Sequence, residues 1–286
     1  MRRGLSVPRF RCWIVACVAI SLLVIWGCVE LDEITQFAKT SQDVGKAFPD
    51  MADEAQTSCD RANSFQNTQN LPASLDCKVY VNLKPSLVKI NAALFNYIAS
   101  LGKLASADLT KVPGGFDSLS ADLKQADPSI STENQGKATA ASSLAKAITN
   151  VWANGYRQHE LSKLIGENNQ AVQQVTDFLS NYAADKFAQS LKDEWRFESA
   201  YCTGVTADAE PLAYNLLMRK CSADKARIEL QLSAIKSYQG ALATIASTHQ
   251  KLYDERSHWD AKKLSKYLGP QIVSLGSAAV SVNKAF

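Results

Sequence analysis

Two stretches with the same apolar spacing decide the fold: LVKINAALFNYIASLGKL at residues 87–104 and IELQLSAIKSYQGALATI at residues 228–245. In each stretch six positions recur at intervals of 3, 4, 3, 4 and 3, and we call each set of six a stripe. The second stripe is shifted from the first by 141 residues. The positions are Leu87, Ile90, Leu94, Tyr97, Leu101 and Leu104, then Ile228, Gln231, Ile235, Tyr238, Leu242 and Ile245. Heptad spacing places such side chains along one face of an α-helix. Each stretch is therefore predicted to be a helix with one face in a core.

The sequence around these stretches is also typical of helices. Proline is absent from residues 129–210 and 212–269, and proline is the residue least compatible with a helix interior. The only strand-like alternation is CKVYVNL at 77–83, for which a short extended connector suffices. The chain is therefore predicted to be all-α.

Further landmarks accompany both stripes in the same order. Each stripe follows a pair of cysteines, and each is followed by an aromatic-Asp pair and then by a Lys-x-x-x-Pro-x-Ile motif. The motifs are Phe116-Asp117 with Lys124, Pro128 and Ile130, and Trp259-Asp260 with Lys266, Pro270 and Ile272, at a shift of 142–143. This order indicates a tandem duplication, with repeat 1 at 31–160 and repeat 2 at 161–286. The alternative is one irregular bundle whose heptads match by chance.

Each repeat is expected to run long helix, disulfide loop, heptad helix, short helix and closing helix. The long helices are expected near 31–58 and 168–200. Pro85 suits the first turn of the first heptad helix. The second closing helix is expected to begin near Pro270.

The first closing helix is expected to start at a capping box, Thr132-x-x-Gln135. The range 132–165 contains no proline, and as one helix it would be about 50 Å long at a rise of 1.5 Å per residue. This favours elongated helical bundles over a compact body.

The N-terminus has the order of an export signal. The first dozen residues carry four arginines and no acid, and an apolar run follows from Trp13 to Trp26. This run is shorter than the roughly 20 residues that span a bilayer comfortably. The alternative to a cleaved signal is an uncleaved signal anchor, oriented by its arginines.

The run ends on Ile25-Trp26-Gly27-Cys28, which resembles the lipobox of bacterial lipoproteins, although Trp26 is larger than the usual residue there. The resemblance covers only the signal peptide, 1–27, and the anchor, 28–30. It implies that Cys28 carries an acyl chain such as palmitate and is the mature N-terminus. Because Val29 stands where Asp would favour inner-membrane retention, the resemblance implies an outer-membrane location facing the periplasm. Several acyl chains on one cysteine would hold the protein stably on the membrane.

Charge argues against nucleic acid as a partner. Removing residues 1–27 takes four arginines and no acid from 31 basic and 28 acidic residues, which leaves 27 against 28. The formal charge of the mature chain is then −1, whereas nucleic-acid binding needs a basic surface.

Four cysteines remain once Cys12 and Cys17 leave with the signal and Cys28 takes lipid. In an oxidising compartment an even number favours disulfides. Three connectivities are possible, and pairing between nearest neighbours is the simplest: Cys59 with Cys77, and Cys202 with Cys221. Each bridge would restrict the unfolded chain by roughly 3 kcal/mol on the entropy model. A metal site is disfavoured because no C-x-x-C motif occurs.

The sequence contains no recognisable catalytic motif, so no catalytic residue, metal ligand or cofactor is predicted. Glu255-x-x-His258 has the spacing found in di-metal helical bundles, but the matching position in repeat 1 supplies no second motif. His249 falls at the next stripe position and is expected at the edge of the core with a solvated ring nitrogen. His159 lies beside Glu160 in a polar run.

Aromatic residues also gather near the expected helix ends. Trp152, Tyr156, Trp195 and Phe197 are expected to pack in the core or at bundle ends, and the alternative is a surface that binds a partner.

These observations favour a lipid-anchored, non-enzymatic helical scaffold or adaptor that contacts another envelope protein. The alternative is a carrier on the periplasmic side that holds an apolar or peptidic ligand between the repeats. A membrane-inserting protein would need an apolar hairpin after Cys28, and a metalloenzyme would need a fuller ligand set; the sequence supports neither. Oligomeric state is not indicated.

Overall fold

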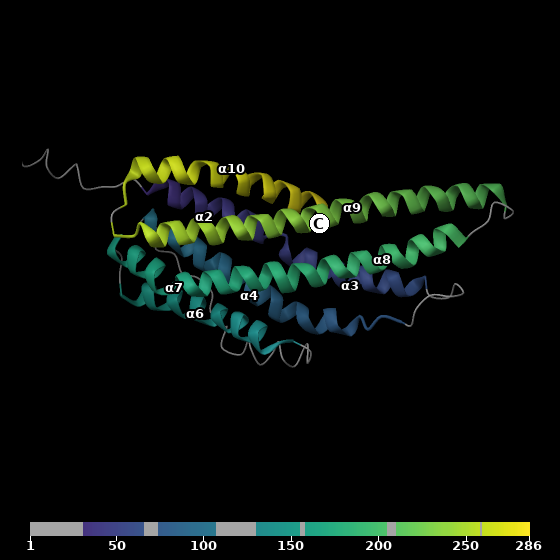
Figure 1. The fold of residues 1–286 in the computed structure, drawn as a ribbon, viewed down its shortest axis with the longest axis horizontal. Helices are drawn as coiled ribbons and strands as arrows, with labels where there is room; N and C mark the ends of the chain where they lie inside the picture. The colour runs from purple at the N-terminus through teal and green to yellow at the C-terminus, as the bar shows by residue number, and fades with distance from the viewer. Residues whose placement is uncertain (1–30, 66–73, 107–129, 155–157, 205–209, 258) are drawn as a thin grey trace, which may run out of the picture.

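The computed structural model describes residues 31–65, 74–106, 130–154, 158–204, 210–257 and 259–286, except for the side chains of 148–159 and 261. Within these ranges the secondary structure is helical and contains no strand, which confirms the all-α prediction. The helices form an elongated bundle (Figure 1).

The same sequence of elements occurs in both halves of the chain. The first half contains α2 (Asp32–Gly45), α3 (Phe48–Ser64), α4 (Lys78–Ala105) and α6 (Thr132–Asn154). The second contains α7 (Gln158–Phe178), a π-helical turn η2 (Leu179–Ala183), α8 (Ala184–Gly204), α9 (Pro211–Asp254) and α10 (Ala261–Ala285). The division expected between residues 160 and 161 thus falls in the first turn of α7.

The packing of the helices also corresponds between the halves. Helix α4 contacts α2, α3 and α6, and α9 contacts α7, α8 and α10 in the same roles. The closing helices cross over, because α6 also packs on α7 and α10 also packs on α2, while α3 lies against α8. The halves therefore interlock around one continuous core.

The two heptad stripes lie inside this core, as their spacing predicts. Every one of the twelve stripe positions is buried, including Gln231, the only polar residue among them. Tyr97 donates its hydroxyl proton to His249 Nε2 at 2.9 Å and lies 3.2 Å from the Leu164 carbonyl, and Tyr238 donates to Asn91 Oδ1 at 2.8 Å. A buried tyrosine ring with a partnered hydroxyl is the arrangement expected at both positions.

Two prolines lie inside helices rather than at helix starts. Helix α4 begins at Lys78, so Pro85 lies in its third turn and the extended connector expected at 77–83 is wrong. Helix α10 begins at Ala261, capped by the Asp260 carboxylate, which accepts from the Lys263 amide at 2.9 Å, so Pro270 does not open it. A proline deprives the carbonyl four residues earlier of its partner. At Pro85 that residue is Val81, which is exposed, so water can solvate the carbonyl.

The long helix expected near 31–58 is interrupted between Gly45 and Phe48. The Asn91 amide of α4 donates to the Gly45 carbonyl at 3.1 Å, which satisfies a backbone acceptor freed by the break. A Cβ atom at position 45 would collide with the ring of Phe95. Glycine is therefore required here because α4 approaches the backbone of α2 closely.

Three other helix boundaries differ from expectation. The range 132–165 is not one helix, because α6 ends at Asn154 and packs back against α7. The cap of α6 is Ser131, whose hydroxyl accepts from the Asn134 amide at 3.1 Å, one residue before the expected Thr132. The second long helix begins at Gln158 rather than near 168.

Candidate functional site: the disulfide-linked end of the bundle

Both expected disulfides are present. Cys59 of α3 bonds to Cys77, which caps α4, with a Cα–Cα distance of 5.6 Å. Cys202 in the last turn of α8 bonds to Cys221 of α9, with a Cα–Cα distance of 6.3 Å. The pairing between nearest neighbours is thus confirmed, and each bridge links a long helix to the heptad helix that follows it.

An ionic cluster with a buried carboxylate at its centre joins the two halves beside these disulfides. Its centre is Glu194 of α8, which is 1% exposed. Arg61 of α3 donates to both Glu194 oxygens, at 2.6 and 3.0 Å, and Arg227 of α9 donates to one of them at 2.6 Å. The same two arginines donate to Glu54 Oε1, at 2.5 and 3.0 Å. Charge-assisted hydrogen bonds of this kind compensate part of the cost of burying ions.

The protonation equilibria follow from these contacts. Burial acts to raise the pKa of Glu194, but hydrogen bonds from Arg61 and Arg227 outweigh it and lower that pKa below its ordinary value. Burial acts to lower the pKa of Arg61, but the hydrogen bonds to Glu194 and Glu54 raise it. Glu194 and Arg61 are therefore ionised at neutral pH.

Glu198, one helical turn after Glu194, has a different environment. It is 1% exposed, and no hydrogen-bond donor of the described chain reaches its Oε2 atom. Burial and the neighbouring Asp224 carboxylate raise the pKa of Glu198 to about 7. Lys220 lies 3.8 Å from Glu198 Oε1 but is ion-paired with Asp224, and its contact with Asp224 lowers the pKa of Asp224 against the effect of burial.

Glu198 also lies next to the second disulfide. One carboxylate oxygen of Glu198 and the Sγ atoms of Cys202 and Cys221 lie within 4.8 Å of one another. The i, i+4 spacing of Glu198 and Cys202 on α8 produces this contact. Both sulfurs are already bonded to each other, so the trio is a carboxyl group beside a disulfide rather than a set of free metal ligands.

A cavity of about 350 Å³ opens beside this trio. The described residues that line it are Ser64, Phe65, Glu198, Tyr201, Leu217, Lys220 and Cys221. The rings of Phe65 and Tyr201 lie 5.6 Å apart, centroid to centroid, and connect α3 to α8. The second disulfide is thus adjacent to a space that a small molecule could enter.

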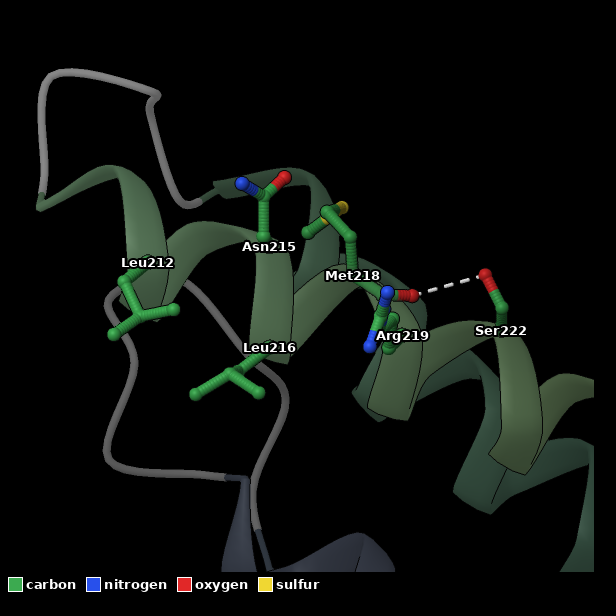
Figure 2. Close-up of a pocket in the computed structure, with 6 residues that line it drawn as sticks. All are labelled: Leu212, Asn215, Leu216, Met218, Arg219 and Ser222. Carbon is green, nitrogen blue, oxygen red and sulfur yellow. Dashed lines mark hydrogen bonds between the residues drawn. The ribbon is translucent and has the colours of Figure 1, made fainter.

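The first turns of α9 form a second hollow, of about 700 Å³ (Figure 2). We call its lining the tip surface, which consists of Leu212, Asn215, Leu216, Met218, Arg219 and Ser222. Leu212 and Leu216 are 68% and 57% exposed. Figure 2 shows all six side chains on α9, with the Ser222 hydroxyl donating to the Met218 carbonyl at 2.9 Å.

A buried polar chain crosses the middle of the bundle. Tyr97 of α4 contacts His249 Nε2 at 2.9 Å, and His249 Nδ1 contacts Asn169 Oδ1 at 2.9 Å. Asn169 donates its amide to Gln250, so its Oδ1 is the acceptor and the proton of neutral His249 lies on Nδ1. The expectation of a solvated His249 is wrong, because the residue is completely buried, and burial lowers its pKa to about 3.

The other residues considered from the sequence have these positions. Cys28, Tyr156 and His258 lie outside the described residues, as do the side chains of Trp152 and His159. Glu255 is ion-paired with Lys251 at 2.7 Å. Phe197 is buried and Trp195 is partly buried against the core, as core packing predicts.

The sequence analysis predicted neither the ionic cluster nor the position of Glu198 beside the second disulfide. The i, i+4 spacing of Glu198 and Cys202 is the only local signal for that position. No local pattern places Arg61 beside Glu194, which is 133 residues away.

No family model, curated protein or solved structure matches this chain. In the part of the chain that the structure describes, none of the helices combines the length and the apolar character needed to cross a bilayer.

Proposed function

We propose that this protein is a lipid-anchored, non-enzymatic helical protein of the bacterial cell envelope that acts as a scaffold or adaptor through protein–protein contacts. Lipid on Cys28 would hold it on the outer membrane, facing the periplasm. The two disulfides support export, because such bonds persist in oxidising compartments. The resemblance of Ile25–Cys28 to a lipobox supports the anchor.

The observation that carries the adaptor proposal is the tip surface. Leu212 and Leu216 are exposed at i, i+4 spacing, with Met218 and Arg219 beside them. Clustered exposed apolar residues on a soluble bundle are typical of contact sites, and Met and Arg are enriched in protein interfaces. This surface is suited to a partner helix or loop that brings apolar side chains.

The position of the tip surface supports the same proposal. Figure 1 shows the start of α9 at the end of the bundle opposite to the start of α2. The proposed anchor at Cys28 precedes α2 by a few residues in the sequence. Helix α9 has 44 residues, which corresponds to about 66 Å at a rise of 1.5 Å per residue. The bundle would thus present its apolar tip at a distance from the membrane.

Site-specific photo-crosslinking in cells tests the proposal. A photoreactive residue at position 216 of the full chain should give one discrete protein adduct, and Leu212→Asp should remove it by placing a charge in the contact. The matched control is position 273 on α10, where Val273 is 70% exposed. No protein adduct at 216, or the same adduct from 273, would contradict a specific contact at the tip.

A carrier that binds an apolar or peptidic ligand between the halves is the second candidate. That space contains the buried rings of Phe48, Phe187 and Tyr238, and Phe48 lies 5.5 Å from each of the other two, centroid to centroid. A ligand would have to displace this packing, so the adaptor is the better-supported function.

A further inference from the structure

The Cys202–Cys221 disulfide differs from Cys59–Cys77 in its chemical surroundings. Glu198 is adjacent to the Cys202 and Cys221 sulfurs, and the cavity of about 350 Å³ is lined by Cys221 and Lys220. At the other disulfide, the group within reach of Cys77 Sγ is the Asn63 amide, at 3.2 Å. Among the described residues, no carboxyl or imidazole group joins Cys59 and Cys77 in a comparable cluster.

We propose that Cys202–Cys221 is a thiol-exchange site whose substrate is a small dithiol, with Glu198 as the proton donor to the leaving sulfur. The dithiol enters through the cavity and approaches Cys221, which lines it, whereas Cys202 lies on the α8 side next to Glu198. The exposed Lys220, which is ion-paired with Asp224, lines the entrance.

The exchange balances in two steps. A thiolate of the dithiol attacks Cys221 Sγ, the Cys202–Cys221 bond breaks, and the electron pair remains on Cys202 Sγ, which takes the proton of Glu198. The second thiolate of the dithiol then attacks its own partner sulfur in the mixed disulfide, and Cys221 leaves and is protonated from water. The protein gains two electrons and two protons, the dithiol becomes a cyclic disulfide, and Glu198 regains a proton from solvent.

A proton donor is needed because this location is unfavourable for a thiolate on Cys202. Cys202 lies in the last turn of α8, where the helix dipole disfavours negative charge. The Glu194 and Asp224 carboxylates face the same region from α8 and α9. The cations near these carboxylates are already ion-paired with them, so they do not stabilise a thiolate on Cys202. Arg61 and Arg227 bind Glu194 and Glu54, and Lys220 binds Asp224.

Glu198 can supply that proton near neutral pH. Its carboxyl group is buried, no described donor satisfies Oε2, and burial together with Asp224 raises its pKa to about 7. A carboxyl group with this pKa is about 90% protonated at pH 6 and about 10% protonated at pH 8. The supply of protons to Cys202 should therefore fall about tenfold between these pH values.

Exchange would also release the first turns of α9, residues 211–220, from their covalent link to α8. Leu212 and Leu216 of the tip surface lie on this segment, so any effect of exchange on partner binding rests on the proposed function. The exchange chemistry itself does not rest on the proposed function. A rate measurement on the isolated full chain tests that chemistry separately.

The test is the rate of reduction by dithiothreitol, followed by acid quenching, alkylation and peptide mass mapping of both disulfides. The rate constant is expressed per concentration of dithiothreitol thiolate, so that the pH dependence of the attacking group is removed. For Cys202–Cys221 of the natural chain this constant should fall about tenfold from pH 6 to pH 8. In Glu198→Gln it should be independent of pH and, at pH 6, at least about tenfold below that of the natural chain. Cys59–Cys77 in the same molecule should be reduced more slowly, with no such inflection.

Glu229→Gln is the matched control, because Glu229 is an exposed carboxylate on α9, and it should leave the profile unchanged. If Glu198 only repels the incoming thiolate, Glu198→Gln will react as fast as or faster than the natural chain at pH 6, which overturns the proposal. A flat profile in the natural chain, or faster reduction of Cys59–Cys77, also overturns it. The last two measurements need no variant, so either can overturn the proposal even if Glu198→Gln does not fold.

Discussion

Leu101→Ala and Leu242→Ala test whether the two heptad stripes are equivalent parts of one core. Both leucines are fully buried and occupy matching positions, 141 residues apart. Each change removes three carbon atoms, which corresponds to about 2.4 kcal/mol of transfer free energy at roughly 0.8 kcal/mol per carbon. The cavity left behind adds to this, so each variant should lower the free energy of unfolding by about 3–4 kcal/mol.

The measurement is equilibrium urea unfolding of the mature chain with its disulfides intact, monitored by far-ultraviolet circular dichroism. The matched control is Leu230→Ala on α9, where the leucine is 45% exposed. It should cost under about 1 kcal/mol, because surface truncations have small effects. If Leu242→Ala costs no more than this control while Leu101→Ala costs several kcal/mol, the two stripes are not equivalent and the correspondence between the halves is wrong.

Three further predictions follow from the buried polar groups and the disulfides. Glu194→Gln should cost about 1–3 kcal/mol in the same unfolding assay, because it removes the buried carboxylate that Arg61 and Arg227 share and leaves these partly exposed arginines with Glu54 alone; a loss under about 0.5 kcal/mol would show that these ion pairs contribute nothing to stability. His249 has a folded-state pKa of about 3, below its unfolded value of 6.5, so the stability that it contributes is complete above pH 6.5 and is lost as pH falls toward 3. The stability difference between the natural chain and His249→Asn should therefore shrink by about 2 kcal/mol from pH 7.5 to pH 5. Comparing the two chains cancels the opposite trend of Glu198, whose raised pKa favours the folded state as pH falls. An unchanged difference would mean that His249 titrates normally. Non-reducing peptide mapping should recover the two disulfides in exported protein, and a peptide joining Cys59 to Cys202, or free thiols at all four positions, would contradict the pairing.

The sequence was most informative where the determining contacts are local. Heptad spacing predicted both buried stripes, including Gln231, because one helix face is read from residues three and four apart. The disulfides were predicted for the same reason, since each joins cysteines 18 or 19 residues apart on consecutive helices. The partnered hydroxyls of Tyr97 and Tyr238 followed from their place in the stripes.

Contacts between distant residues account for the errors. The break after Gly45 depends on Asn91 and Phe95, which lie on another helix. Pro85 is tolerated inside α4 because the carbonyl that it frees is on an exposed turn. His249 is buried because Tyr97 and Asn169, from two other helices, satisfy both ring nitrogens. The crossing of α6 and α10 onto the opposite half likewise has no local signal.

A lipid anchor on Cys28 is the central claim of the proposed function, because it would leave the apolar tip of the bundle facing away from the membrane. Intact-mass measurement tests this anchor most directly. The full chain, produced in a diderm bacterium and extracted from its envelope with detergent, should have a mass that begins at Cys28 and includes acyl chains, with two disulfides. It should partition into the detergent phase, whereas Cys28→Ala should lack the lipid and be released or mislocalised. A mature protein that begins at Met1 and carries no lipid would contradict the proposed anchor.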